Sequence, residues 1–176
     1  ADEGNLSNEQ RFNLLNEYEN NFLKSFENKY ENEFWYSLKI TIEKFNIEKN
    51  LFLDLISAFK QDVTKNRYKT ESEILDYCRR SANPVGRILL KIFNVENQEA
   101  KMASDKICTA LQLTNFYQDV SIDIKKNRIY VPESKMNKYN IVENDFYKGT
   151  MNDNLIMLFK DLTLVRSIIG CKISDN

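Results

Sequence analysis

Apolar residues recur at helical spacing through most of the chain, beginning with its first segment. Ser7 and Gln10 stand three positions apart, the spacing of a capping box at a helix start. The apolar residues that follow return every three or four positions, as on one helix face. The apolar stripe of this predicted helix is Phe12, Leu15, Tyr18, Phe22 and Phe26.

Two more helices are predicted before residue 64. The stripe of the first is Phe34, Trp35, Leu38, Ile42 and Phe45. The second runs from about Glu48 to Val63, and its stripe is Leu51, Phe52, Leu55, Ile56 and Phe59. Both patterns have the period of a helix that buries one face.

A helix with a break in it is predicted next. Thr70 and Glu73 have the spacing of a second capping box and start a helix that runs to Ala82. The pair Asn83-Pro84 interrupts it, because the residue before a proline is pushed away from helical geometry. Helix resumes over Val85–Phe93.

The C-terminal half predicts two helices around a polar region. One long helix spans about Asn97 to Asp123, and 128–132 is an extended exit from it. Residues 135–151 are polar and loop-like. The last helix covers 153–169, and its inward residues are Leu155, Ile156, Phe159, Leu162 and Val165. No strand-like alternation persists, so we expect an all-α helical bundle and a single domain over residues 1–176.

Composition supports this fold class and narrows the chemistry. Four Gly and two Pro among 176 residues leave few of the turns that an all-β fold needs. A net charge of −1 gives no general reason to expect nucleic-acid binding. No apolar run approaches the length of a membrane span.

The absence of histidine from these 176 residues excludes several kinds of site. Ser-His-Asp and Cys-His catalysis and histidine-bound zinc all need it. Cys78, Cys108 and Cys171 form no C-x-x-C pair, which favours free thiols in a reducing compartment. A bound metal would therefore take mostly oxygen ligands, which favours Mg²⁺, Mn²⁺ or Ca²⁺.

Asn115, Asp119 and Asp123 stand four residues apart in sequence, so a helix places them on one face. Two carboxylates one turn apart repel each other, and a divalent cation would remove this repulsion. Gln112 lies near the same face and could hydrogen-bond a phosphate oxygen. Lysines and Arg128 follow at once and offer cations for a released diphosphate. An acid pair on a solvated helix is the alternative, although the apolar turns before it favour burial.

Two further patterns have simpler interpretations. Residues 77–87 place small residues, a proline and a glycine behind Tyr77, which indicates a kinked helix beside a ligand or a kink made only for packing. The string Phe-x-Gln-Asp-Val ends at Val63 and again at Val120. We interpret the repeat as chance, since the position four after Asp62 is Asn66 and only the second copy makes an acid pair.

Residues 77–86 (YCRRSANPVG) and 110–132 (ALQLTNFYQDVSIDIKKNRIYVP) resemble the squalene/phytoene synthase family, whose enzymes join or ionise prenyl diphosphates. The resemblance runs from about Phe52 through Pro132. It implies an isoprenoid-synthase-type helical bundle in which two aspartate-rich motifs face each other and Mg²⁺ bridges both to the substrate diphosphate.

The resemblance assigns roles to particular residues. Asp119 and Asp123 match the second aspartate-rich motif, and Gln112 and Asn115 match its upstream polar partners. Asp2 matches the last aspartate of the first motif. Tyr77 matches a family tyrosine that lines the reaction cavity. Arg128 and Tyr130 match the substrate-binding exit segment after the second motif, where the arginine is expected near the diphosphate.

The departures from the common pattern indicate one branch of the family. Ser81-Ala82-Asn83 replaces the usual Val-Ala-Gly, and Gln118 replaces an arginine. These strings look more like the bacterial hopanoid-pathway branch, which takes presqualene diphosphate to hydroxysqualene. Two alternatives stay open: condensation of two farnesyl or geranylgeranyl diphosphates, and a non-catalytic relative that acts as an assembly factor.

Both ends of the chain look incomplete against the family pattern. It begins without Met at Ala1-Asp2-Glu3, and the family's C-terminal helices have no counterpart. We therefore expect a fragment whose activity by itself is in doubt. A cytoplasmic protein is expected, with loose association at the inner membrane because the products are lipids. The sequence does not indicate an oligomeric state.

Overall fold

Helix α1 (Asn8–Ser25) begins at the predicted capping box. The Gln10 amide donates to Ser7 Oγ at 3.2 Å, and the Ser7 amide donates to Gln10 Oε1 at 2.8 Å. Two amides that a helix start leaves without partners are thereby satisfied. The protein is represented by a computed structural model that describes residues 6–163.

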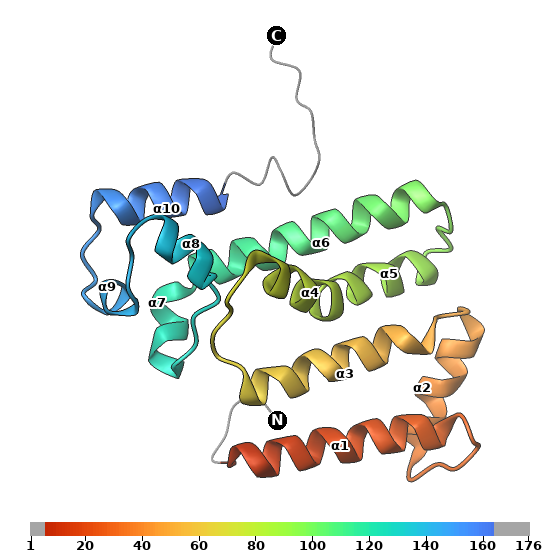
Figure 1. Ribbon diagram of the computed structural model, residues 1–176. Helices are drawn as coiled ribbons and strands as arrows, with labels where there is room; N and C mark the ends of the chain where they lie inside the picture. The colour runs from red at the N-terminus through yellow and green to blue at the C-terminus, as the bar shows by residue number, and fades with distance from the viewer. Residues whose placement is uncertain (1–5, 164–176) are drawn as a thin grey trace.

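The described residues form a helical bundle without strands (Figure 1). Its first half consists of α1, α2 (Glu33–Lys44), α3 (Lys49–Thr64), α4 (Glu71–Ser81) and α5 (Asn83–Ile92). Its second half consists of α6 (Gln98–Gln118), α7 (Val120–Asp123), the 3₁₀ turn η1 (Ile124–Lys126), α8 (Glu133–Lys138), α9 (Glu143–Tyr147) and α10 (Asp153–Thr163). The all-α prediction is confirmed.

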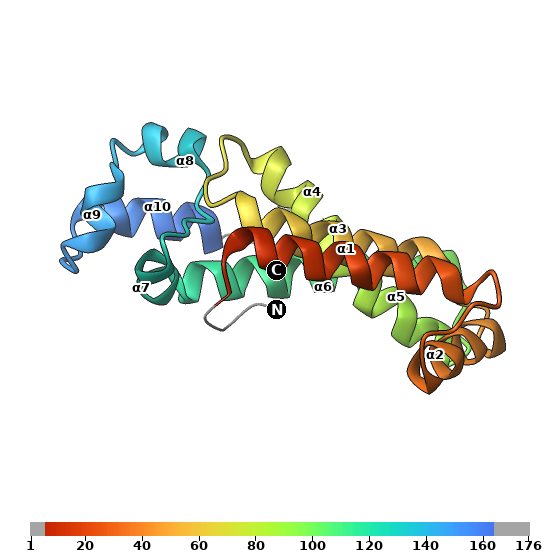
Figure 2. The same cartoon turned by 90° about the horizontal axis from the view of Figure 1, so that it is seen from below.

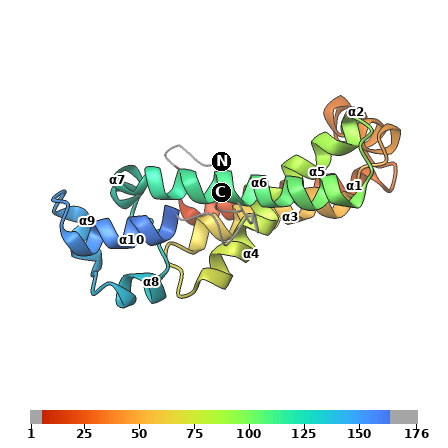
Figure 3. The same cartoon turned by 90° about the horizontal axis from the view of Figure 1, so that it is seen from above.

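The bundle is elongated along α6. Helices α1, α3 and α5 lie in successive layers, and α5 packs against α6 (Figure 1). Helices α7 to α10 gather at the C-terminal end of α6, whereas α2 lies at the opposite end of the molecule (Figures 2 and 3). None of the helices within residues 6–163 is long and apolar enough to cross a bilayer.

Three buried clusters follow this arrangement. The first joins α1, α2 and α3 through Phe22, Trp35, Ile42, Ile47 and Leu51. The second lies between α3, α4, α6 and the exit segment, and consists of Ala58, Tyr68, Ile74, Tyr77, Cys78, Leu113, Phe116 and Tyr130. The third fills the α7–α10 end with Ile124, Ile129, Val131, Met136, Ile141, Phe146, Leu155, Leu158 and Leu162. The second cluster holds two of the predicted site residues.

The predicted break is present but lies at Ala82, so that α5 begins at Asn83 with Pro84 in its first turn rather than at Val85 as expected. Pro84 has no amide hydrogen to continue the α4 ladder, and the Val85 amide bonds to Ala82 O at 3.1 Å instead. Immediately after the break, Gly86 packs directly on α6. A methyl group there would overlap Ser104 Oγ and lie 2.6 Å from Cys108 Sγ. The kink therefore brings α5 against α6 at a distance that only glycine permits.

The exit segment, residues 128–132, is not helical, in agreement with the prediction, and it is hydrogen-bonded to the α3–α4 loop. The Ile129 amide donates to Asn66 O at 3.0 Å, and the Glu133 amide donates to Tyr68 O at 2.9 Å. Asn127 precedes the segment with φ of 57°, a left-handed conformation that asparagine tolerates. This pairing ties the residues after the acid pair to the middle of the bundle.

Some predicted details differ from the structure. The helix expected to run to Asp123 breaks at Asp119, where φ is −92° and ψ is 9°. The region expected to be loop-like contains α8 and α9, which are short because they form around single buried residues, Met136 and Phe146. Ile156, expected to point inward, is 39% exposed. Val165 lies outside the described residues.

The second capping box is only half formed. Thr70 Oγ1 accepts from the Glu73 amide at 3.4 Å, as expected. The Glu73 carboxylate instead accepts the Lys69 amide at 3.0 Å and pairs with Lys65. The Glu73 carboxylate therefore binds the Lys69 amide and the Lys65 side chain, and not the Thr70 amide that a complete capping box would use.

Candidate functional site

Asp119 and Asp123 remain one helical turn apart despite the break in the helix. The Asp119 amide donates to Asn115 O at 2.9 Å, and the Asp123 amide donates to Asp119 O at 2.8 Å. The four-residue hydrogen-bond spacing therefore continues from Asn115 through Asp123. The predicted common face of these three residues is supported by the backbone. Asn115 and Asp119 are exposed, and Asp123 is half-buried.

The environment of Asp123 suits a cation. Burial raises the pKa of its carboxyl above the ordinary value, and the charge of Asp119 raises it further. Arg128 and Lys126 act in the opposite direction but do not cancel the effect. A divalent cation between the two carboxylates would relieve both the repulsion and the cost of burial.

Gln112 lies on α6 near the same face and is half-buried. Its position three residues before Asn115 places both amide side chains on successive turns that lead to Asp119. The predicted upstream polar partners therefore lie in line with the acid pair. Asp2, the predicted ligand from the first motif, is outside the described residues.

Arg128 and Tyr130 are brought to the bundle by the exit segment. Arg128 Nη2 donates to the backbone oxygen of Asp62, on α3, at 3.1 Å. Tyr130 is buried, and its ring stacks on Phe116 of α6 with centroids 3.8 Å apart. Burial is the main cause that raises the pKa of Tyr130, so the phenol stays protonated.

Tyr77 lies in the same aromatic cluster. Its ring centroid is 5.8 Å from Phe116 and 6.1 Å from both Tyr68 and Tyr130. Its hydroxyl donates to Asp62 Oδ2 at 2.7 Å. Burial, followed by the nearby carboxylate of Asp62, raises the pKa of Tyr77 well above its ordinary range. The phenol is therefore a hydrogen-bond donor at every physiological pH.

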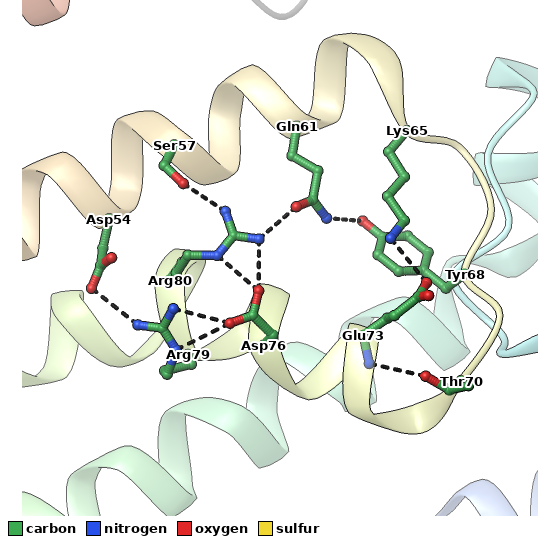
Figure 4. A network of polar contacts seen from close by, with 10 residues as sticks. All are labelled: Asp54, Ser57, Gln61, Lys65, Tyr68, Thr70, Glu73, Asp76, Arg79 and Arg80. Carbon is green, nitrogen blue, oxygen red and sulfur yellow. Dashed lines mark hydrogen bonds and ion pairs between the residues drawn. The ribbon is translucent and has the colours of Figure 1, made fainter.

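The two arginines after Tyr77 fasten α4 to α3 (Figure 4). Arg80 donates to Ser57 Oγ at 2.6 Å and pairs with Asp76 on its own helix at 2.9 Å. Arg79 reaches Asp54 at 3.4 Å. The part-buried contact of Arg80 with Ser57 holds the helix that carries Tyr77 against α3, whereas the longer and more exposed Arg79–Asp54 pair contributes little.

Sequence reasoning missed three residues of this site: Asp62, Tyr68 and Phe116. All three contact or surround Tyr77. Asp62 belongs to the first copy of the repeated Phe-x-Gln-Asp-Val string, which we interpreted as chance. That repeat was the available signal, although its meaning depends on how α3 and α4 pack.

The acid pair supplies only part of a metal site. Within residues 6–163 no three acidic or cysteine side chains converge in the arrangement of a metal centre. Two carboxylates with open positions nevertheless match how Mg²⁺ binds when it shares phosphate oxygens and waters. The residues present therefore fit a Mg²⁺–diphosphate half-site better than a closed structural metal site.

Residues 1–165 match the family model described as squalene/phytoene synthase. The chain belongs to the squalene/phytoene synthase family. Members of this family are enzymes that use prenyl diphosphates, and the acid pair, Tyr77 and the exit segment all lie within the matched range.

The chain is also similar to individual members of the squalene/phytoene synthase family. It is 39% identical over 100 residues to the hydroxysqualene synthase of Sinorhizobium fredii, and the aligned region covers 56% of this chain and 34% of that protein. It is 45% identical over 85 residues to the hydroxysqualene synthase of Zymomonas mobilis, covering 48% of this chain and 28% of that protein.

A solved structure also matches. The squalene synthase HpnC from Alicyclobacillus acidocaldarius is 32% identical and has a TM-score of 0.81. The match covers 88% of this chain and 59% of that structure. The chain thus has the fold of the family's enzymes and matches about a third of the length of the first curated relatives.

Proposed function

We propose that this protein ionises presqualene diphosphate and directs water to the resulting cation, which gives hydroxysqualene. The observation that carries the proposal is the acid pair Asp119–Asp123, in which burial and like charge raise the pKa of Asp123. This pair lies in residues 1–165, which match the family model, and the chain is 39% and 45% identical to two hydroxysqualene synthases over 100 and 85 residues. Squalene and hopanoid biosynthesis is the corresponding pathway.

The acid turn, residues 119–123, would hold Mg²⁺ against the substrate diphosphate. Bound there, Mg²⁺ supplies Lewis-acid stabilisation of the leaving group. Asp119 and Asp123 contribute two carboxylate ligands, and Asn115 and Gln112 offer amide hydrogens to phosphate oxygens. Arg128, anchored to α3, adds positive charge where the diphosphate departs.

The aromatic cluster suits the second half of the reaction. Neighbouring rings in the cluster of Tyr77, Phe116, Tyr130 and Tyr68 have centroids 3.8 to 6.1 Å apart, and the cluster would offer π-electron density to a carbocation. None of them is an ionised nucleophile, because burial keeps the phenols of the three tyrosines protonated. The cation is therefore stabilised without being trapped by the protein.

The test uses the chain expressed from its complete gene. We expect Mg²⁺-dependent conversion of presqualene diphosphate to hydroxysqualene, identified by mass spectrometry. Asp119→Asn and Asp123→Asn should each lower turnover by at least about a hundredfold, since each removes a charged metal ligand. Asp153→Asn, at an exposed acid on α10, is the matched control and should retain activity.

The runner-up function is condensation of two prenyl diphosphates to presqualene or phytoene diphosphate. The family description, which includes phytoene synthases, favours it as the second candidate. Consumption of farnesyl or geranylgeranyl diphosphate without turnover of presqualene diphosphate would establish it. A protein that turned over no prenyl diphosphate in Mg²⁺ would instead support a non-catalytic assembly role.

A further inference from the structure

The first Phe-x-Gln-Asp-Val string has a structural role that differs from that of the second. Its Gln61 and Asp62 lie on the last turns of α3 and face α4 and the α3–α4 loop. Each contacts a tyrosine of the aromatic cluster. Gln61 Nε2 donates to Tyr68 Oη at 3.2 Å, and Tyr77 Oη donates to Asp62 Oδ2 at 2.7 Å.

The Asp62 contact fixes a hydroxyl that would otherwise rotate. A phenol has a single hydrogen to donate, and an ionised carboxylate only accepts. A short hydrogen bond to a charged acceptor is about twice as strong as one between neutral groups. Tyr77 is 5% exposed, so few solvent partners compete. The direction of its hydroxyl and the tilt of its ring are therefore set by α3.

Gln61 holds the neighbouring ring in the same way and is itself held. Arg80 Nη2 donates to Gln61 Oε1 at 2.5 Å, which orients the amide so that its nitrogen faces Tyr68 (Figure 4). The backbone oxygen of Asp62 receives Arg128 Nη2 at 3.1 Å. One turn of α3 thus contacts two cluster tyrosines and the arginine of the exit segment.

We propose that Asp62 is a positioning residue for the reaction, and that it acts through the hydroxyl of Tyr77. The inference rests on the proposed function, in which the Tyr77 ring faces the carbocation. When the hydrogen bond to Asp62 is lost, the ring turns away from the geometry that stabilises the transition state. The loss falls on kcat, because Tyr77 does not bind the diphosphate that dominates KM.

A double-mutant cycle on the complete gene product separates this role from a general structural one. The variants are Asp62→Leu, which keeps the size and removes the acceptor, Tyr77→Phe, and the double variant. Asp62→Asn retains an acceptor oxygen. Asp54→Leu is the matched control, because Asp54 is a second half-buried acid of α3 that pairs with Arg79 rather than with a cluster tyrosine.

We expect Asp62→Leu and Tyr77→Phe each to lower kcat about tenfold, with KM within about twofold. The double variant should be no slower than either single variant, and Asp62→Asn should stay within about threefold of wild type. Asp54→Leu should keep the wild-type kcat. Thermal unfolding of every variant should show that all are folded at the assay temperature.

The outcomes distinguish a failure of the positioning role of Asp62 from a failure of the proposed function. If wild type is active but the two losses multiply in the double variant, or Asp62→Asn is as slow as Asp62→Leu, the positioning role is wrong and the proposed function stands. The cycle is measured on whichever prenyl diphosphate the wild type consumes. If wild type does not consume presqualene diphosphate, the proposed function fails, and if it consumes no prenyl diphosphate at all, the positioning role fails with it.

Discussion

The ring of Tyr130 lies face to face with the ring of Phe116, with centroids 3.8 Å apart and planes that differ by 6°. Phe116 belongs to α6, three residues before Asp119, and Tyr130 belongs to the exit segment, two residues after Arg128. The stack therefore joins the helix that carries the acid pair to the segment that carries the arginine. Packing between these two rings therefore helps to set the distance between the acid pair and Arg128.

Truncation of this stack should destabilise the protein. Tyr130→Ala removes a buried ring and should lower the free energy of unfolding by about 3–5 kcal/mol. Tyr130→Phe keeps the ring and should cost less than about 1 kcal/mol. Urea denaturation followed by circular dichroism measures both values. Equal stabilities for the two variants would mean that the stack contributes little.

Gly86→Ala should separate α5 from α6. The added methyl group overlaps Ser104 Oγ and approaches Cys108 Sγ, so we expect a loss of about 1–3 kcal/mol in the free energy of unfolding. Removing the closer obstacle in the double variant Gly86→Ala/Ser104→Ala should restore part of the loss. A double variant less stable than the sum of both single changes would contradict this steric explanation.

Asp123→Asn should stabilise the metal-free protein at neutral pH. The pKa of Asp123 is raised in the folded state, so its proton is held more tightly there than in the unfolded chain. This contribution to stability is present below the ordinary pKa of 3.8 and is lost as the pH rises through the folded-state pKa. At pH 7 the variant avoids that loss, and below about pH 3.8 its advantage should disappear.

Adding Mg²⁺ should reverse the order of stability, so that the wild-type protein becomes more stable than Asp123→Asn. Bound Mg²⁺ stabilises the folded wild type, whereas the variant lacks one ligand and gains less. Thermal unfolding with and without MgCl₂, at ionic strength matched with NaCl, measures the difference. An equal rise in both proteins would contradict a role for Asp123 as a ligand.

Acid should loosen α10 from α8 through Asp161. Hydrogen bonds from Lys135 and Lys138, both 3.0 Å, lower the pKa of Asp161 to about 2. The stability that this provides is present above the ordinary value of 3.8 and is lost as the pH falls toward about 2. Because the group is partly exposed, its contribution is below about 1 kcal/mol. Asp161→Asn should flatten the pH dependence of urea unfolding between pH 4 and pH 2, and an unchanged slope would contradict the assignment.

Local signals in the sequence predicted the parts of the fold that local physics decides. The Ser7–Gln10 box and the break next to Pro84 both involve neighbouring residues, and both are present in the structure. The break at Asp119 has no such signal, because neither glycine nor proline lies near it. Helices α8 and α9 are too short to show a period and exist because Met136 and Phe146 are buried.

In the candidate site, too, the features set by neighbouring residues could be predicted from the sequence, and those set by helix packing could not. The spacing of Asp119 and Asp123 lies within one stretch of chain, so sequence alone predicted that they share a face. The role of Asp62 depends on the approach of α3 to α4, which no spacing along the chain encodes. Its partner Tyr77 was predicted from the family resemblance, but the contact between the two residues required coordinates.

The pairing of the exit segment with the α3–α4 loop also has a consequence for how the chain folds. The hydrogen bond from Ile129 to Asn66 closes a loop of about sixty residues, whereas α5 and α6 follow each other in sequence and pack across a much shorter stretch. Contacts between distant residues cost more chain entropy and form more slowly. We therefore expect α5 and α6 to pair early and the exit segment to dock late, so a newly made chain should bring Arg128 and Tyr130 to the bundle only near the end of folding.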